Sequence, residues 1–229
     1  MNLRPDELGL RERKKLEMRL LLRAVAIRLF AERGFDAVTV ADIAAAASVS
    51  EKTVFNYFGT KEDLVASGRA EAEESIVRAV RERPAGQSVL AAVRAQVLDL
   101  AERVHTVPAE QRALWRKVIK SSPSVLMRMH QMAYQQEQVL AALLREESGA
   151  SEDDPMTSAI AATIGVLQRL AFCGITGWPN GKKQSLSEVT ANIHRTFDLF
   201  EQGLGDYGVR KPASPSGFRV QRSSERRHR

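Results

Sequence analysis

The sequence predicts an all-α protein, and three observations support this prediction. Apolar residues recur at helical spacing through most of the 229-residue chain. Capping residues mark where helices begin, and glycine or proline marks where they end. Alternating apolar and polar runs, which indicate strands, are almost absent. The hydrophobic content of 44% is sufficient for a sizeable core, and the charged content of 27% is ordinary for a folded chain.

The first two helices are predicted at 11–33 and 40–47. Along the first, apolar side chains lie three and four residues apart, and Gly34 ends the pattern. Thr39 is the expected N-cap of the second helix. Asp42 lies three residues further on, where its carboxylate can complete a capping box.

Two further capped starts follow closely. Ser50 is the expected N-cap of a short helix that reaches Phe58. Thr60, with Asp63 at its capping-box position, begins a longer helix that continues to about residue 83. Three capped helix starts between residues 39 and 60 form a specific pattern of closely spaced helices.

The segment Pro-Ala-Gly-Gln at 84–87 separates this region from the rest of the chain. Beyond it, the periodicity predicts helices at 88–104, 109–120, 123–147, 156–176 and 186–203. Pro123 and Pro155 fit first helical turns, because each follows a capping residue. From Gly208 onward, prolines, serines and arginines predominate and large apolar residues are few, which predicts disorder.

The segment 39–58 has the dimensions of a helix-turn-helix, with a tight turn at Ser48-Val49. In its second helix, a step of about 100° per residue places Val54 and Phe58 on one face, which must point to the core. The opposite face carries Lys52, Thr53 and Asn56, with Phe55 and Tyr57 at its flanks. These side chains are donor-rich and mostly short, which favours a DNA major groove over the alternative of a solvated face.

The stretch 22–64, LRAVAIRLFAERGFDAVTVADIAAAASVSEKTVFNYFGTKEDL, strongly resembles the N-terminal domain of TetR-family regulators. The matching landmarks are Phe30, Gly34, Thr39-Val40, Ile43-Ala44, Val49-Ser50, Thr53, Tyr57-Phe58, Lys61-Glu62 and Leu64. The chain departs from the family's pattern at Ser48, where glycine is frequent, and at Phe55, where many relatives carry tyrosine. A left-handed Ser48 would be strained, and Phe55 can touch a thymine methyl but cannot donate a hydrogen bond.

The resemblance implies a homodimer with nine or ten helices. Such a protein is usually a repressor that releases double-stranded operator DNA when a ligand enters its C-terminal domain. By similarity, phosphate contacts are expected from Thr39, Tyr57 and Lys61. Base-edge contacts are expected from Lys52, Thr53 and Asn56, with Phe55 as their apolar neighbour. The basic run at 11–19 either reaches the DNA or is a solvated first part of a helix.

The expected organisation has three parts. A helix-turn-helix DNA-binding domain is predicted at 11–60, and a ligand-binding and dimerisation domain at 61–205, with the helix at 61–83 connecting them. A disordered basic tail is predicted at 206–229. Charge is distributed unevenly, with a net charge of +3 for residues 1–23, +6 for 208–229 and −3 between them. Basic ends suit a polyanion, although a solvated tail is equally consistent with the C-terminal charge.

The C-terminal part is expected to bind a small apolar or amphipathic effector. Aromatic and methionine side chains gather there, and charged candidates are few. The predicted ligand-binding residues are Trp115, Met129, Met132 and Phe172, with plain core as the alternative interpretation.

The last two helices are the expected dimer surface. Small and medium apolar residues, including Ala162 and Val166, share one face of 156–176, and Ile193, Phe197 and Phe200 share one face of 186–203. Burial inside the subunit is the alternative for both faces.

The composition also argues against several other classes of protein. The single cysteine and four separated histidines exclude an internal disulfide and a Cys-pair metal site, and no cofactor is expected. No nucleophile has a partnered base, so an enzyme is not expected. Neither a signal core nor an apolar run of membrane-span length is expected, which favours the cytoplasm. An activator, a ligand-independent regulator and a helical interaction module without DNA binding are the alternatives that stay open.

Overall fold

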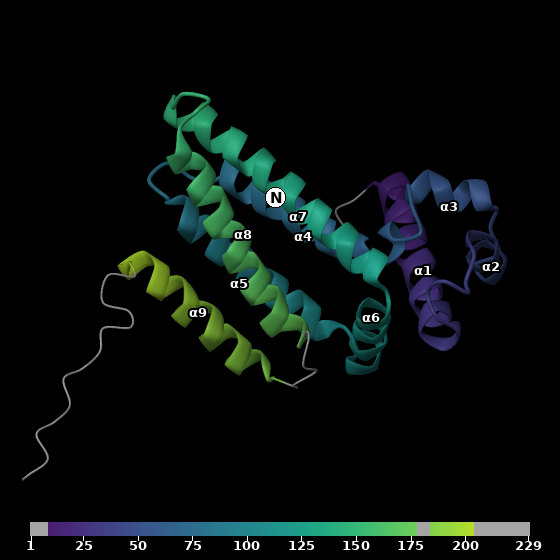
Figure 1. Ribbon diagram of the computed structural model, residues 1–229. Coiled ribbons are helices and arrows are strands. Elements are labelled where there is room, and N and C mark those ends of the chain that lie inside the picture. The colour runs from purple at the N-terminus through teal and green to yellow at the C-terminus, as the bar shows by residue number, and fades with distance from the viewer. Residues whose placement is uncertain (1–8, 178–183, 204–229) are drawn as a thin grey trace, which may run out of the picture.

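The computed structural model describes residues 9–177 and 184–203, and this part of the chain contains nine α-helices and no strand (Figure 1). The helices are α1 (Leu10–Arg33), α2 (Val40–Ala46), α3 (Glu51–Tyr57), α4 (Asp63–Arg81), α5 (Val89–Thr106), α6 (Ala109–Ser121), α7 (Pro123–Ser148), α8 (Pro155–Thr176) and α9 (Leu186–Gln202). The predicted all-α fold is confirmed, and every predicted helix is present with ends shifted by a few residues. The predicted tail at 206–229 lies outside the described residues.

The predicted caps of α2 and α3 are present. Asp42 N donates to Thr39 Oγ1 (3.1 Å), and Thr39 N donates to Asp42 Oδ2 (2.8 Å), which completes the capping box. At the next helix, Thr53 N donates to Ser50 Oγ (3.1 Å). These bonds satisfy amides that a helix start leaves without intrahelical partners, so short helices can form here.

The turn between α2 and α3 contains Ser48 with φ 57°, which is the only positive φ of a non-glycine residue in the described part of the chain. The left-handed conformation costs an L-residue roughly 1–2 kcal/mol, because Cβ approaches the following carbonyl oxygen. The tight turn between two capped helices imposes this conformation on the serine.

We therefore expect Ser48→Gly to raise the free energy of unfolding by up to about 1 kcal/mol. Strain relief exceeds the entropy that glycine adds to the unfolded chain. Ala47→Gly is the matched control, since Ala47 has φ −90° and ψ 0°, and this change should destabilise by about 0.5–1 kcal/mol. Urea denaturation of both variants measures the difference, and a loss of stability in Ser48→Gly would show that the turn carries no such strain.

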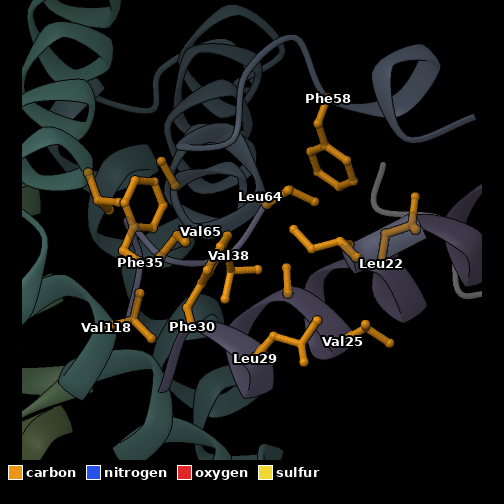
Figure 2. Close-up of a cluster of buried hydrophobic side chains, with 14 of the residues drawn as sticks. Leu22, Val25, Leu29, Phe30, Phe35, Val38, Phe58, Leu64, Val65 and Val118 are labelled. Carbon is orange, nitrogen blue, oxygen red and sulfur yellow. The ribbon is translucent and has the colours of Figure 1, made fainter. Parts of the chain in front are cut away.

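A first core cluster joins α1, α2 and α3 to the start of α4 and to α6 and α7 (Figure 2). The rings of Phe30 and Phe35 lie 4.7 Å apart within it. Val118 of α6 and Met129 of α7 belong to the same cluster. The three N-terminal helices therefore share their core with residues beyond the connecting helix α4.

A second core cluster lies between α4, α5, α7, α8 and α9. It contains Ile193 and Phe197, which are buried inside the subunit, with Phe197 only 1% exposed. The expectation that these two residues form the dimer surface is wrong. Helix α9 uses its apolar face to pack on α5 and α8, so the alternative of burial within the subunit holds for this helix.

Helix α8 is long and apolar enough to count as a membrane-length segment, although the sequence predicted none. By length and composition alone this helix could span a membrane. An 18-residue stretch of it has a mean hydropathy of 1.5, and only 22% of that stretch is buried inside the subunit. The helix contains a single charged residue, Arg169, and its apolar character comes from alanines and from large aliphatic and aromatic residues that small or polar residues interrupt. Packing against α5, α7 and α9 places it in the helical bundle.

Two polar contacts fix α6 to α1 and α7 to the start of α4. Lys117 Nζ donates to Ala31 O at the end of α1 (2.7 Å). Arg128 Nε donates to Asp63 Oδ1 at the start of α4 (2.8 Å). Asp63 also exchanges capping bonds with Thr60, although the regular geometry of α4 begins only at Asp63.

Candidate functional site

The outer face of α3 is the first candidate site. Val54 is 1% exposed and Phe58 is buried, which confirms the predicted inward face of this helix. Lys52 and Asn56 are exposed, and Phe55 has 52% of its surface exposed. A large aromatic side chain held at the surface beside polar donors suits contact with base edges and the thymine methyl group.

The two threonines predicted to contact DNA already form hydrogen bonds inside the domain. Thr39 Oγ1 donates to Asp42 Oδ2 (2.7 Å), and hydrogen bonds from Thr39 lower the pKa of this carboxyl. The hydroxyls of Thr53 and Ser50 lie 2.8 Å apart. The predicted contacts of both threonines with DNA stay predictions.

Lys61, a predicted phosphate contact, is also part of the local structure. Its Nζ donates to the carbonyl oxygens of Phe35 (2.9 Å) and Val38 (3.2 Å), and it lies 4.3 Å from the centre of the Phe35 ring. The ammonium therefore ties the loop before α2 to the loop before α4. The sequence offered no signal for this link, because the carbonyls that accept the bonds come from a distant loop.

Tyr57 lies at the end of α3, where it meets the first turns of α1. Arg11, Lys14 and Lys15 line a shallow groove together with Tyr57 and Glu12. The structure thus places part of the basic run at 11–19 beside a predicted phosphate contact. This arrangement places positive charge beside the outer face of α3, which suits contact with a phosphate backbone.

The second candidate site is a cavity of about 500 Å³ between α4, α6, α7 and α8. Its apolar lining includes Ile119, Leu126, Met129, Leu140, Val166 and Phe172. A cavity of this size and mixed lining is suitable for a small organic molecule.

The four predicted ligand residues divide between the cavity wall and the shell behind it. Met129 and Phe172 line the cavity, whereas Trp115 and Met132 do not. The Trp115 ring packs edge-on against Phe172 at 5.4 Å, and its Nε1 donates to Val65 O of α4 (3.1 Å). Trp115 therefore supports the wall from behind, and the ligand-binding roles of all four residues stay predictions.

The charged part of the cavity wall was not predicted from the sequence. Arg69 Nε donates to Glu73 Oε1 (2.6 Å), with the two side chains only 11% and 7% exposed. Burial raises the pKa of Glu73, although Arg69 acts in the opposite direction. Arg169 and Cys173 of α8 also line the cavity, and burial raises the pKa of the Cys173 thiol. Two charged residues four apart on a helix usually indicate a solvated face, so no pattern distinguished this pair.

Ala162 and Val166 of α8, which were expected at the dimer surface, also line the cavity. In the described part of the chain, no cluster of three or more histidine, cysteine or carboxylate side chains has the arrangement of a metal site.

The fold and the exposed face of α3 define a helix-turn-helix DNA-binding protein. Residues 22–67 match the family model described as "Bacterial regulatory proteins, tetR family". A similar protein is the HTH-type transcriptional regulator TcmR of Streptomyces glaucescens, with 27% identity over 155 residues, which cover 66% of this chain and 69% of that protein. The HTH-type transcriptional regulator LuxR of Vibrio harveyi is 44% identical over 63 residues, which cover 26% of this chain and 31% of LuxR.

Solved structures of TetR-family members align with most of the chain at low identity. One from Mesorhizobium loti has a TM-score of 0.49 and 16% identity over 82% of this chain and 96% of that one. Thermus thermophilus FadR, a structure in complex with lauroyl-CoA, has a TM-score of 0.44 and 23% identity over 87% of this chain and 100% of that one. The family model thus matches the helix-turn-helix region at residues 22–67, and over about two thirds of its length the chain is similar to a curated HTH-type transcriptional regulator. Its relatives are regulators and not enzymes, as the sequence predicts.

Proposed function

We propose that the protein is a cytoplasmic repressor that binds a palindromic operator as a homodimer and releases it when a small effector enters the cavity. The observation that supports this proposal most directly is the outer face of α3, where Lys52, Phe55 and Asn56 are exposed above the buried Val54. Each subunit of a two-fold dimer can place one such helix in the major groove of a half-site.

The dimer proposal is supported by the surface of α8. Ile160 and Leu170 are 40% and 50% exposed, and Met156 is exposed one turn before Ile160. At about 100° per residue these three side chains fall within roughly 80° of one another, so they form one apolar stripe along a helix that the subunit leaves largely uncovered. An apolar stripe of this kind is typical of a two-fold interface, and we propose that a second copy covers it.

Coupling between the cavity and DNA is supported by the position of α4. Leu64 and Val65, at its start, belong to the core shared with α1, α2 and α3, whereas Arg69 and Glu73 line the cavity two turns later. A ligand that shifts α4 therefore also shifts the core residues on which α3 packs. For release, the effector must bind the DNA-free state more tightly than the DNA-bound state.

The test is the binding of DNA from upstream of the protein's own gene, measured against a scrambled duplex in a salt titration. Lys52→Ala is expected to cost roughly 1–3 kcal/mol on the specific duplex and much less on the scrambled one, because its ammonium faces base edges. Lys120→Ala is the matched control, since Lys120 is an exposed lysine of α6 away from the reading face.

Equal losses on the two duplexes would assign Lys52 to the phosphate backbone, so that specificity would rest on Thr53, Phe55 and Asn56. Failure of the wild-type protein to prefer any native duplex would favour the helical interaction module. A reporter placed behind the bound duplex separates repression from activation, since loss of the protein raises expression only if it represses.

A further inference from the structure

The polar wall of the cavity carries information about the chemistry of the effector. We propose that the effector is an amphipathic carboxylate, whose charged group is bound by Arg69 and Arg169 beside Cys173 while its apolar body packs on α6 and α7. This inference rests on the proposed function, in which the cavity binds an effector.

Arg69 is arranged to bind a carboxylate in addition to its intrahelical partner. The bond to Glu73 uses Nε, and the guanidinium carbon lies 5.2 Å from the centre of the Phe172 ring. Guanidinium also has two terminal NH₂ groups, which match the two oxygens of a carboxylate in a planar fork. Because Arg69 is held on one side by Glu73 and on its face by Phe172, little side-chain freedom is lost when a ligand binds.

Arg169 supplies a second positive charge to the same part of the cavity. It lines the wall on α8, four residues before Cys173 and three before Phe172. The positive charges of Arg69 and Arg169 both act to lower the pKa of the Cys173 thiol, against the larger effect of burial. The two arginines, which come from different helices, therefore line the same cavity together with Cys173.

The carboxylates of the cavity are less suited to bind a cation. Glu73 is already bonded to Arg69, and its raised pKa shows that burial disfavours its charged form. Glu137, the other acidic residue of the lining, extends from α7 toward Gly165, one helical turn before Arg169 on α8, so the arginine charge there opposes the binding of a cation. The apolar lining of Leu126, Met129 and Leu140 then faces the remainder of the molecule.

Three fluorescent probes of one shape test the proposal, namely 9-anthracenecarboxylate, 9-anthracenemethanol and 9-(aminomethyl)anthracene. Titration of the wild-type protein is expected to show the carboxylate binding about tenfold more tightly than the alcohol, because a charge-assisted fork is gained. The amine is expected to bind most weakly. Arg169→Gln should reduce carboxylate affinity about threefold to tenfold and leave alcohol affinity unchanged. Arg81→Gln, at an exposed arginine of α4 outside the cavity, is the matched control.

Two variants of the buried pair give opposite results. Arg69→Lys keeps the charge beside Glu73 but removes the fork, so only carboxylate affinity should fall. Glu73→Gln removes the competing carboxylate, so carboxylate affinity should rise. Equal affinities of the three probes, tighter binding of the amine, or no binding of the carboxylate would overturn the inference. Operator binding by the wild-type protein without any probe tests the proposed function separately.

Discussion

Replacing Ile160 and Leu170 by glutamate is expected to produce folded monomers that no longer hold the operator. Both side chains are exposed on α8, so the charges would not enter the core of the subunit, whereas two copies of each charge would meet at the proposed interface. A monomer binds only one half-site and loses the gain from linked binding, so operator affinity should fall by about 10²–10⁴-fold.

Light scattering measures the mass of this variant, circular dichroism its helix content and gel shift its affinity. Val139→Glu is the matched control, because it places the same charge at an exposed apolar position on α7. A double variant that stays dimeric would mean that α8 does not form the interface. A monomer that retains full operator affinity would instead contradict binding as a dimer.

Phe197→Ala is expected to have the largest effect on stability, lowering the free energy of unfolding by about 3–5 kcal/mol. Phe197 is buried in the second core cluster, and the guanidinium carbon of Arg94 lies 5.4 Å from its ring centre. Truncation removes both the buried area and this contact and leaves a cavity between α5, α8 and α9.

Leu199→Ala, two residues along the same helix at a partly exposed position, should cost much less and serves as the control. Urea denaturation at a fixed protein concentration measures both, because dimerisation also contributes to apparent stability. A Phe197→Ala protein of unchanged stability that becomes monomeric would return this residue to the dimer surface.

The sequence predicted the elements that local chemistry determines. The caps at Thr39 and Ser50, and the inward face at Val54, depend on residues within one or two turns, so periodicity and capping rules were sufficient. The left-handed conformation at Ser48 was raised instead by the family resemblance, because glycine is frequent at this position.

Features that depend on distant packing could not be predicted in this way. Phe197 has the same helical spacing whether it packs on α5 or on a second copy, so the sequence left both interpretations open. Arg69 and Glu73 have the spacing of an ordinary surface pair, and only the covering by α7 and α8 makes them a cavity wall. The ammonium of Lys61 binds carbonyls far away in sequence, which no local pattern records.

The first core cluster determines whether the N-terminal helices α1 to α3 can unfold separately from the rest of the chain. Leu64 and Val65 of α4 and Val118 of α6 complete the packing around Phe30 and Phe35 (Figure 2). Helices α1, α2 and α3 therefore do not have a core of their own, because part of the core around them comes from α4 and α6, which lie later in the chain. Local unfolding of α6 would expose this shared core and destabilise α1 to α3. We therefore expect the N-terminal helices and α6 to unfold as one cooperative unit.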